Sequence, residues 1–478
     1  MKHMELDLCI KGGNVVSPTG ISETDIGIRG EKIVLLGDGK LFPHAEKTRD
    51  VTGKYIIPGG IDTHSHLEVG FQGAQAADDF YSGTVAAAFG GTTCIIDFAR
   101  CIKGGSAVEV LRKRMDQAQS KAVVDYGFHV TLTEASPQII SEIKEVVQMG
   151  CPSFKLFMIY KKEGQMIDDG GLLAVFEEAA KWNAIAGVHA ENAAITEHNV
   201  EKAVFENKLD WIHHALTKPN IVEAEAIQRV LLFSKHVGNA LNIFHMSTHE
   251  GVDLVSEAQR DGYPVYAETT PHYLTFTEDV YTRPDGHYYL CSPPLRKQKD
   301  IDQLWKGFRF GCPTFTGTDH ASFPLIDKEK FLEKKNGQLI PNFTKVANGV
   351  PGIEVRLPIL LNGVREGKLR MTDLVRIFSA NAARIFGLYP RKGVIEIGSD
   401  ADLVVIDPNR EKILSARTLH MHVDYCLYEG MKVIGYPIMT ILRGRILVED
   451  EKLFGDPGSG KFLKREIDPI VLKNSYWL

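Results

Sequence analysis

The sequence lacks a membrane-spanning stretch and an excess of positive charge. No run approaches the roughly 18 consecutive apolar residues that cross a bilayer, and the acidic start around Glu5 and Asp7 does not have the layout of a signal peptide. The formal net charge is -6 at pH 7, which gives no reason to expect nucleic acid as a partner. We therefore expect neither a membrane nor a nucleic-acid partner, and look for a small-molecule substrate.

Cysteine is also scarce and is not arranged in pairs. The chain has seven cysteines, an odd number, scattered without regular spacing. Disulfide frameworks of secreted domains use even numbers of cysteines at characteristic spacings. A reducing compartment is the simplest setting for such a chain, and we predict a cytoplasmic location.

What is present is the composition of a globular protein with repeated strand and helix patterns. The 478 residues are 44% hydrophobic and 24% charged, and this length exceeds one ordinary domain. Short apolar or β-branched stretches alternate with helix-like sequence through the middle of the chain. Repeated strand-then-helix order predicts a parallel sheet or barrel.

Both ends of the chain have a different pattern from the middle. Before about Tyr55, apolar and polar residues alternate as in strands, with glycine turns between them. The same pattern returns after Gly393, in residues 394–398, 402–407 and 440–445. These ends predict one small β domain made of residues 1–57 and 393–478, beside a barrel domain of residues 58–392.

Six residues of metal-ligand type lie at or near the ends of the apolar stretches. His64 and His66 follow such a stretch, and side chains two apart on a strand point to the same face, so both rings can reach one ion. A lone His-x-His pair is weak evidence, because two solvated loop histidines give the same pattern. Four further stretches, however, carry Lys155, His189, His245 and Asp319. Because barrel active sites lie at the carboxyl ends of the strands, the six residues predict a metal site.

This set of residues resembles the metal ligands of the binuclear amidohydrolases, and specifically those of the dihydropyrimidinase and hydantoinase branch. The resemblance runs over nearly the whole chain, and its local motifs are residues 78–80 followed by 90–93, residues 153–155 with Tyr160 five residues on, and residues 189–192, 292–296 and 348–354. It implies an α/β fold, a (β/α)8 TIM barrel with a small β-sandwich domain built from both termini. It also implies a homotetramer, with Tyr476, Trp477 and Leu478 as a plausible subunit contact.

The resemblance further implies a pair of divalent metal ions, with zinc as the expected metal. A buried lysine is costly unless it is paired or modified, and an ammonium cannot bridge two cations because it has no acceptor. In the family the lysine is carbamylated by CO2, so that Lys155 would bind one metal with each carbamate oxygen. His64, His66 and Asp319 would hold the first ion, and His189 and His245 the second. The alternative for Lys155 is an unmodified lysine at a strand edge whose ammonium reaches solvent.

Catalytic and substrate-binding roles also follow from the resemblance. Asp319 is either a plain metal ligand or the general base that takes a proton from the attacking hydroxide and passes it to the leaving nitrogen, and we predict the second. Tyr160 resembles a tyrosine that supports the developing oxyanion, although a half-buried core tyrosine gives the same pattern. Ser292 and Asn348 match positions whose main-chain groups bind the ring.

The expected substrate is a dihydropyrimidine or a 5-substituted hydantoin, opened to an N-carbamoyl amino acid. Leu67, Phe71 and Phe157 are assigned as the residues that contact the ring substituent. In dihydroorotases and allantoinases an Arg or Asn that touches the substrate follows the His-x-His motif after one residue, and here Glu68 stands there. A carboxylate would repel a carboxylated ring by roughly 1 kcal/mol even where solvent screens it, so dihydroorotate is predicted to be a poor substrate.

Several alternatives remain open at this point. Allantoinase, dihydroorotase and cyclic imidase activities belong to the same superfamily, and non-catalytic scaffold proteins related to dihydropyrimidinases lack the metal ligands that this chain retains. His213, His214, His249 and His272 are predicted to be surface or supporting residues. Residues 455–462 imitate a phosphate loop, but Phe462 stands where a Ser or Thr must reach magnesium, and a flexible tail is expected there.

Overall fold

The computed structural model describes residues 5–476, and its central feature is a sheet of eight parallel strands. The strands are adjacent in reverse chain order, from β17 back to β8, and every neighbouring pair is parallel. Their bounds are β8 (Gly60–Ser65), β11 (Thr92–Cys101), β12 (Asp125–Leu132), β13 (Ser153–Phe157), β14 (Ile185–His189), β15 (Ala240–Ile243), β16 (Val265–Thr269) and β17 (Phe315–Thr316).

The sheet closes on itself between its first and last strands. β8 and β17 are joined by one isolated parallel bridge between Ser65 and His320. Across the same seam the N–H of His66 donates to the carbonyl oxygen of His320 at 2.9 Å, and the N–H of Thr318 donates to Asp62 Oδ1 at 3.0 Å. The predicted (β/α)8 barrel is therefore confirmed, with a seam of one isolated bridge where the other neighbouring strands share two to eight paired positions.

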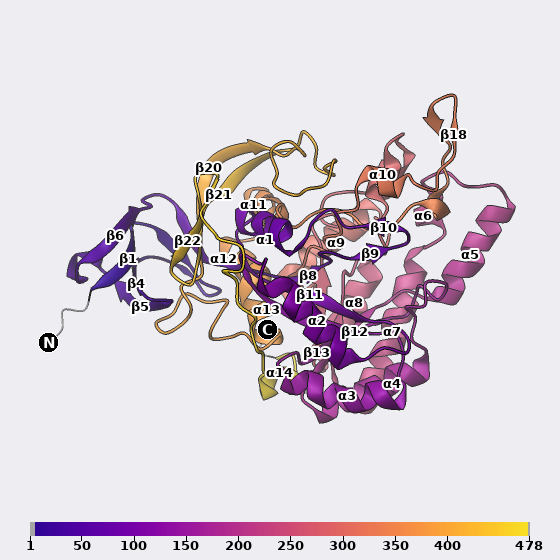
Figure 1. Ribbon diagram of the computed structural model, residues 1–478, viewed down its shortest axis with the longest axis horizontal. Helices are drawn as coiled ribbons and strands as arrows, with labels where there is room; N and C mark the ends of the chain where they lie inside the picture. The colour runs from indigo at the N-terminus through magenta and orange to yellow at the C-terminus, as the bar shows by residue number, and fades with distance from the viewer. Residues whose placement is uncertain (1–4, 477–478) are drawn as a thin grey trace.

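Helices follow the strands and cover the outside of the barrel (Figure 1). The longer ones are α1 (Phe80–Phe89), α2 (Ala107–Gln119), α3 (Pro137–Gln148), α4 (Asp169–Lys181), α5 (Ala193–Phe205), α7 (Asn220–Val237), α8 (His249–Arg260), α9 (Gln298–Gly307) and α11 (Arg356–Arg365). Short helices are α6 (His213–Leu216), α10 (Leu325–Lys328), α12 (Met371–Val375), α13 (Asn381–Ile385) and α14 (Pro469–Lys473).

Side-chain caps fix where many of these helices begin. Asp79, Ser106, Ser136, Asp168 and Thr248 each accept a hydrogen bond from a main-chain N–H in the first turn of the following helix. The first turn leaves these N–H groups without partners inside the helix, so a capping oxygen stabilises the start by about 1 kcal/mol. The loops that carry the site residues are thus held at both ends, by a barrel strand and by a capped helix.

Strands from both termini form two further sheets, seen beside the barrel in Figure 1. One has the order β23-β22-β21-β20-β7-β2-β3, so strands from the two ends of the chain pair directly, and the other has the order β5-β4-β1-β6. The bounds are β1 (Leu6–Lys11), β2 (Asn14–Val16), β3 (Ile21–Glu23), β4 (Asp25–Arg29), β5 (Lys32–Gly37), β6 (Ala45–Asp50), β7 (Tyr55–Pro58), β20 (Leu403–Ile413), β21 (Lys432–Leu442), β22 (Arg445–Glu449) and β23 (Lys452–Leu453).

The two terminal sheets share a buried apolar cluster that includes Ile26, Ile56, Leu403 and Ile441. The small β domain expected from both termini agrees with this arrangement, whereas the extended segment expected at 394–398 contains no strand. The domain bounds at 57/58 and 392/393 stay a prediction. Two short hairpins complete the fold, β9 (Gly70–Phe71) with β10 (Ala74–Gln75) and β18 (Lys334–Lys335) with β19 (Gln338–Leu339).

The segment that follows residue 458 packs under the barrel. The N–H of Lys461 donates to Asp125 Oδ1 at 2.8 Å, and Arg465 donates from Nη2 to Ser153 Oγ at 2.9 Å. Phe462 stacks on Phe128 with ring centroids 6.3 Å apart. The expectation of a flexible tail is therefore wrong, because Phe462 fills an apolar space below the strands. In the range from residue 5 to 476, no helix has both the length and the apolar character needed to cross a membrane.

Candidate metal centre

The six residues predicted to bind metal meet at the carboxyl ends of the barrel strands. Lys155 lies in the middle of β13, His189 is the last residue of β14, and His64 is one residue before the end of β8. His66, His245 and Asp319 follow β8, β15 and β17. The ring centroids of His64 and His66 are 5.2 Å apart, those of His64 and His245 are 5.3 Å apart, and those of His189 and His245 are 4.3 Å apart. The parallel barrel has thus brought together residues that are up to 255 positions apart in the chain (64 to 319).

Asp319 and Lys155 lie between the imidazole rings. Asp319 Oδ1 is 3.0 Å from His64 Nε2 and 3.1 Å from His66 Nε2. Lys155 Nζ is 3.1 Å from His64 Nε2 and 3.5 Å from His245 Nε2. Ligand-type atoms of His64, His245 and Asp319 all lie within 4.8 Å of one another.

Buried carboxylates orient two of the rings from behind. His64 Nδ1 is 2.6 Å from Glu268 Oε1, and His189 Nε2 is 2.7 Å from Glu191 Oε2. A ring nitrogen that donates its proton to a carboxylate leaves a lone pair on the other nitrogen, which can then bind a cation. This donor set, with four imidazoles and a carboxylate around one small space, fits borderline divalent ions such as zinc.

Burial and neighbouring charges set the ionisation of the two central groups. Burial lowers the pKa of Lys155 to about 8, although the charges of Asp319 and Glu268 act to raise it. Burial alone would raise the pKa of Asp319, but the charges and hydrogen bonds of His64 and His66 hold it well below its usual range. At neutral pH Asp319 is therefore ionised, and a fraction of Lys155 is the neutral amine that can react with CO2.

Three residues of the site have strained main-chain conformations. Tyr160, His245 and Asp319 have positive φ angles of 65°, 38° and 49°. For residues other than glycine this conformation costs on the order of 1–3 kcal/mol each, and it is found most often at functional sites. Each of these residues comes just after a barrel strand, where the chain turns sharply and its side chain is directed at the centre.

A cavity opens over the cluster and contains most of the predicted substrate contacts. Phe71, Phe157, Tyr160, Ser292 and Asn348 all line it, together with metal-ligand candidates such as Asp319. The ring of Tyr160 meets those of Phe71 and Phe157 at centroid distances of 5.0 and 6.0 Å. Burial raises the pKa of Tyr160 well above its usual value, so its phenol keeps its proton at neutral pH.

The predicted main-chain contacts at Ser292 and Asn348 already have hydrogen-bond partners nearby. The N–H of Asn348 donates to Gln72 Oε1 at 2.9 Å, and the Asn348 side-chain oxygen Oδ1 is buried without a partner among residues 5–476. The hydroxyl of Ser292 donates to Glu191 Oε2 at 2.8 Å. Because the Ser292 hydroxyl is hydrogen-bonded within the protein, the main chain of Ser292 is the part of this residue that is available to a ligand.

Two residues assigned to the substrate from the sequence lie elsewhere. Leu67 is fully buried against Gly83 of α1, and its N–H donates to Asp97 Oδ2 at 3.0 Å, so its assignment as a substrate contact was wrong. Glu68 has a φ of 52°, which turns the chain away from the cavity, and its carboxylate pairs with Lys121 beyond the end of α2. Glu68 does not line the cavity, and the predicted repulsion of a carboxylated ring loses its basis.

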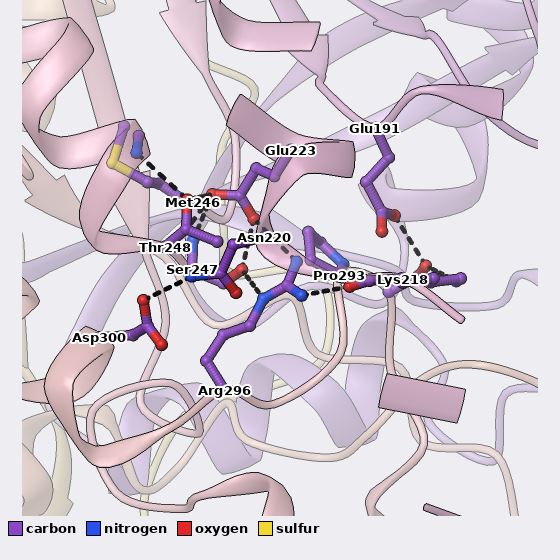
Figure 2. A network of polar contacts seen from close by, with 12 residues as sticks. Glu191, Lys218, Asn220, Glu223, Met246, Ser247, Thr248, Pro293, Arg296 and Asp300 are labelled. Carbon is purple, nitrogen blue, oxygen red and sulfur yellow. Dashed lines mark hydrogen bonds and ion pairs between the residues drawn. The ribbon is translucent and has the colours of Figure 1, made fainter. Parts of the chain in front are cut away.

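A buried polar network adjoins His189 and the loop that follows His245, and Figure 2 shows Glu191, Lys218, Glu223 and Arg296 of this network. Lys218 donates to the hydroxyl of Ser292, which in turn donates to Glu191. Burial acts to raise the pKa of Glu191, but the Lys218 charge and the hydrogen bond from His189 outweigh it and lower this pKa to about 2. The chain Lys218, Ser292, Glu191 and His189 therefore fixes the orientation of one candidate ligand through charges that are all out of solvent.

A second part of the network holds the loop after His245. Glu223 accepts the N–H groups of Ser247 and Thr248 at 3.0 and 3.1 Å, and Arg296 donates from Nε to Ser247 Oγ at 3.0 Å (Figure 2). Asp300 accepts the N–H of His249 at 3.0 Å at the start of α8. These bonds connect the loop after β15 with α7, with α9 and with the loop that precedes α9, so the position of His245 depends on residues far from it in the sequence.

The remaining histidines lie outside the centre, as predicted. His214 Nε2 is 2.7 Å from the carbonyl oxygen of Cys291, and His272 Nε2 is 2.8 Å from Thr270 Oγ1. His249 lies near Glu250 and Asp300 in a group of metal-ligand type. Asp300 accepts hydrogen bonds from the main chain of His249 and from an asparagine amide, and it also lies within hydrogen-bond distance of the His249 ring. These bonds stabilise the start of α8, and this structural role explains why the three residues lie together.

Several residues of the site were missed by the sequence reasoning. Arg100, Gln165 and Phe323 line the cavity, and Glu268 and Lys218 support its ligands. Arg100 comes near the end of the apolar strand β11, which is the same signal that identified the ligand candidates, so it could have been found. Glu268 has the same signal, since it lies one residue before the end of β16, whereas Lys218 has none, because it lies between two helices.

Comparisons with known proteins agree with this geometry. Residues 55–447 match the Amidohydrolase family. The chain is 39% identical over 462 residues to a D-hydantoinase of Ralstonia pickettii, covering 96% of this chain and 99% of that protein. It is 40% identical over 460 residues to a D-hydantoinase of Geobacillus stearothermophilus, covering 95% and 96%. The crystal structure of dihydropyrimidinase from Brevibacillus agri NCHU1002 superimposes with a TM-score of 0.92 at 37% identity, covering 96% of this chain and 99% of that one.

Proposed function

This chain is a cyclic amide hydrolase of the amidohydrolase family, and we propose that it opens a dihydropyrimidine or a 5-substituted hydantoin at an amide C–N bond to give an N-carbamoyl amino acid. The observation that carries the proposal is the meeting of His66, His189, His245, Asp319 and Lys155 at the floor of one cavity with several aromatic rings in its walls, with His64 buried beside Asp319. Relatives named D-hydantoinase and dihydropyrimidinase, at this identity and coverage, support the choice of ring.

The metal site that we propose contains two zinc ions and a carbamate on Lys155. His64, His66 and Asp319 would hold the first ion, His189 and His245 the second, and the two carbamate oxygens would reach one ion each. The position of the Lys155 amine, 3.1 Å from His64 Nε2 and 3.5 Å from His245 Nε2, supports a bridging role. When bound, such ions lower the pKa of water and polarise the carbonyl under attack.

Asp319 is proposed to move the proton during ring opening. It is ionised at neutral pH, because the charges of His64 and His66 lower its pKa, so it can accept a proton from the attacking water. It can then deliver the proton to the ring nitrogen that leaves when the C–N bond breaks. Its position beside His64 and His66, at 3.0 and 3.1 Å, supports this role.

The cavity walls supply the other proposed contacts. Tyr160 keeps its proton and can donate a hydrogen bond to the carbonyl oxygen as it becomes negative. Main-chain groups of Ser292 and Asn348 would hold the ring amide and its carbonyl groups. Phe71 and Phe157 would pack on the ring substituent, since their side chains form the apolar wall.

The quaternary structure and location are proposals that rest on the family resemblance. We propose a homotetramer in the cytoplasm. All seven cysteines are buried and free, which fits a reducing compartment. The predicted subunit contact at the C-terminus includes residues 477 and 478, which lie outside the described residues, while Tyr476 is 72% exposed.

A substrate panel tests the proposed reaction. We expect dihydrouracil or a 5-substituted hydantoin to exceed allantoin and dihydroorotate by at least about tenfold in kcat/KM, which equals about 1.4 kcal/mol of transition-state discrimination. If allantoin, dihydroorotate or a cyclic imide has the highest kcat/KM, the chain has one of the alternative activities. A protein that purifies without stoichiometric metal and opens none of the rings would be a scaffold.

The carbamate has its own test. We expect native mass spectrometry or electron density to show a carboxylate group on the Lys155 side chain. Lys155→Ala should lose bound metal and activity together, because a methyl group can bind neither ion. A fully metallated and active enzyme with an unmodified Lys155 would contradict this part of the proposal.

A further inference from the structure

Arg100 is a cationic side chain in the cavity with no role in the proposed reaction. It lies on β11, one residue before the strand ends, and its Cα pairs with that of Thr131 on β12. Arg100 and Thr131 both line the cavity, together with Phe71 and Phe157. A guanidinium therefore belongs to the wall that otherwise consists largely of aromatic rings.

The guanidinium has no anionic partner within the described part of the chain. Its one hydrogen bond there runs from Nη2 to the carbonyl oxygen of Gly70 at 3.1 Å, which uses one of five N–H donors. The nearest acidic residue in its own strand, Asp97, is taken by Arg114 at 2.6 Å. Glu163, near the cavity mouth, accepts from Gln72 at 3.0 Å.

An unpaired charge in such surroundings is unfavourable. Burying a cation among apolar groups costs several kcal/mol unless an anion and hydrogen bonds compensate it. Other buried arginines of the barrel show the usual solution, since Arg114 pairs with Asp97 and Arg296 with Glu223. The hydrogen bond to the carbonyl oxygen of Gly70 uses one N–H donor of Arg100 and does not neutralise its charge. The remaining donors of Arg100 are therefore available to a ligand.

We infer that Arg100 binds a carboxylate on the substituent of the cyclic ureide, and so selects substrates with an acidic side chain. The inference rests on the proposed function and names the substituent that the same cavity accepts. Arginine presents its donors as a planar fork that matches the two oxygens of a carboxylate. Phe71 and Phe157 line the same cavity, and opposite charges attract each other more strongly beside such apolar groups than in bulk water.

The position of Arg100 along its strand determines how long a substituent must be for its carboxylate to reach the guanidinium. Phe98, two residues earlier, stacks on the His66 ring with centroids 4.8 Å apart and therefore lies at the level of the metal ligands. Two residues of a strand advance by about 7 Å, and β11 runs toward the mouth of the barrel. A carboxylate bonded directly to the ring would lie too deep to reach Arg100, whereas one separated by one or two methylene groups reaches its level.

The test compares a charged and a neutral substituent of the same shape. The substrates are 5-(2-carboxyethyl)hydantoin and 5-(2-carbamoylethyl)hydantoin, and the measured quantity is the ratio of their kcat/KM values. We expect the parent enzyme to favour the acid, and Arg100→Met to lower this ratio by at least about tenfold. Arg100→Lys should keep part of the preference, because it retains the charge without the fork.

Arg112→Met is the matched control. Arg112 lies on α2 outside the cavity, is 60% exposed and pairs with Glu145, so the variant removes the same charge and should leave the ratio unchanged. A parent enzyme that prefers the neutral amide overturns the inference, as does an equal ratio in the parent and in Arg100→Met. If Arg100→Met does not fold, the parent ratio and the Arg100→Lys variant decide.

The outcome is separable from the proposed function. If unsubstituted hydantoin and dihydrouracil are opened and the acid is not preferred, the inference about Arg100 fails and the proposed reaction stands. If neither those rings nor any 5-substituted hydantoin is opened, the proposed function itself fails, and the inference fails with it.

Discussion

Replacing Lys218 by methionine tests whether the buried charges behind His189 act as a unit. Lys218 is 6% exposed, donates to Ser292, and supplies the positive charge nearest to the fully buried Glu191 (Figure 2). Methionine keeps the length of the side chain and removes only the charge and its donors. Glu191 then remains buried with the hydrogen bonds of His189 and Ser292 but without its main compensating charge.

The size of the effect follows from this loss. Removing one partner of a buried ion pair costs about 3–5 kcal/mol, and this case lies near the lower value because Lys218 reaches Glu191 through the Ser292 hydroxyl and two hydrogen bonds of Glu191 survive. Unfolding entropy is about 2.1 cal/mol/K per residue, or about 1 kcal/mol/K for 478 residues. We therefore expect Lys218→Met to lower Tm by about 3 °C, measured by calorimetry at one scan rate because large proteins unfold irreversibly.

Two further variants test whether the effect of Lys218→Met comes from the loss of a buried charge. Lys208→Met removes an exposed lysine that pairs with Glu206 on the surface, and it should shift Tm by less than about 1 °C. The double variant Lys218→Met/Glu191→Gln should lose less than the sum of the single changes, since it removes both charges together. An effect of Lys218→Met no larger than that of Lys208→Met, or strict additivity in the double variant, would refute the charge argument.

Three other predictions follow from the site and its seam. Asp319→Asn should fold normally and lose at least about a hundredfold in kcat, because an amide cannot take the proton, and near-normal turnover would move the base role to another group. The hydrogen bond and charge of His320 outweigh burial and lower the pKa of Asp78 from 3.8 to about 2, so its contribution to stability is full above pH 3.8 and is lost as pH falls toward 2. Asp78→Asn should therefore flatten the fall in Tm between those pH values, and an unchanged acid profile would contradict it. Metal removal by a chelator should abolish activity and speed amide hydrogen exchange in residues 60–66 and 315–320, whereas unchanged exchange would show that the ions do not hold the seam.

The barrel and the ligand candidates could be predicted because both depend on local sequence. A short apolar stretch that ends in a ligand residue specifies a buried strand and the side chain at its carboxyl end, as at His189. Parallel strands then bring such ends together without any further signal. Glu191 and Glu268 lie close to the ends of β14 and β16, but their role in orienting the rings could not be assigned in this way, because it depends on which side chains the fold places beside them.

The errors arose where the chain turns after a strand. Leu67 and Glu68 directly follow His66, and continued strand geometry would have directed one of them at the substrate. The positive φ of 52° at Glu68 instead turns it toward Lys121. Similar φ values at Tyr160, His245 and Asp319 are set by the packed loops around them, and residue type gave no indication of them.

The closing seam of the barrel and the metal centre are the same part of the molecule. His64 and His66 stand on one side of the seam and Asp319 on the other, and the ring is completed there by a single bridge between Ser65 and His320. Asp62 on β8 accepts both the N–H and the hydroxyl of Thr318, at 3.0 and 2.6 Å, so buried polar groups compensate for the missing ladder. A cation shared by ligands from both strands would add a bond across this seam that the main chain does not supply. The part of the barrel that is weakest in strand pairing is thus the part that a bound cation would strengthen, and the integrity of the barrel would then depend on the occupancy of the metal site.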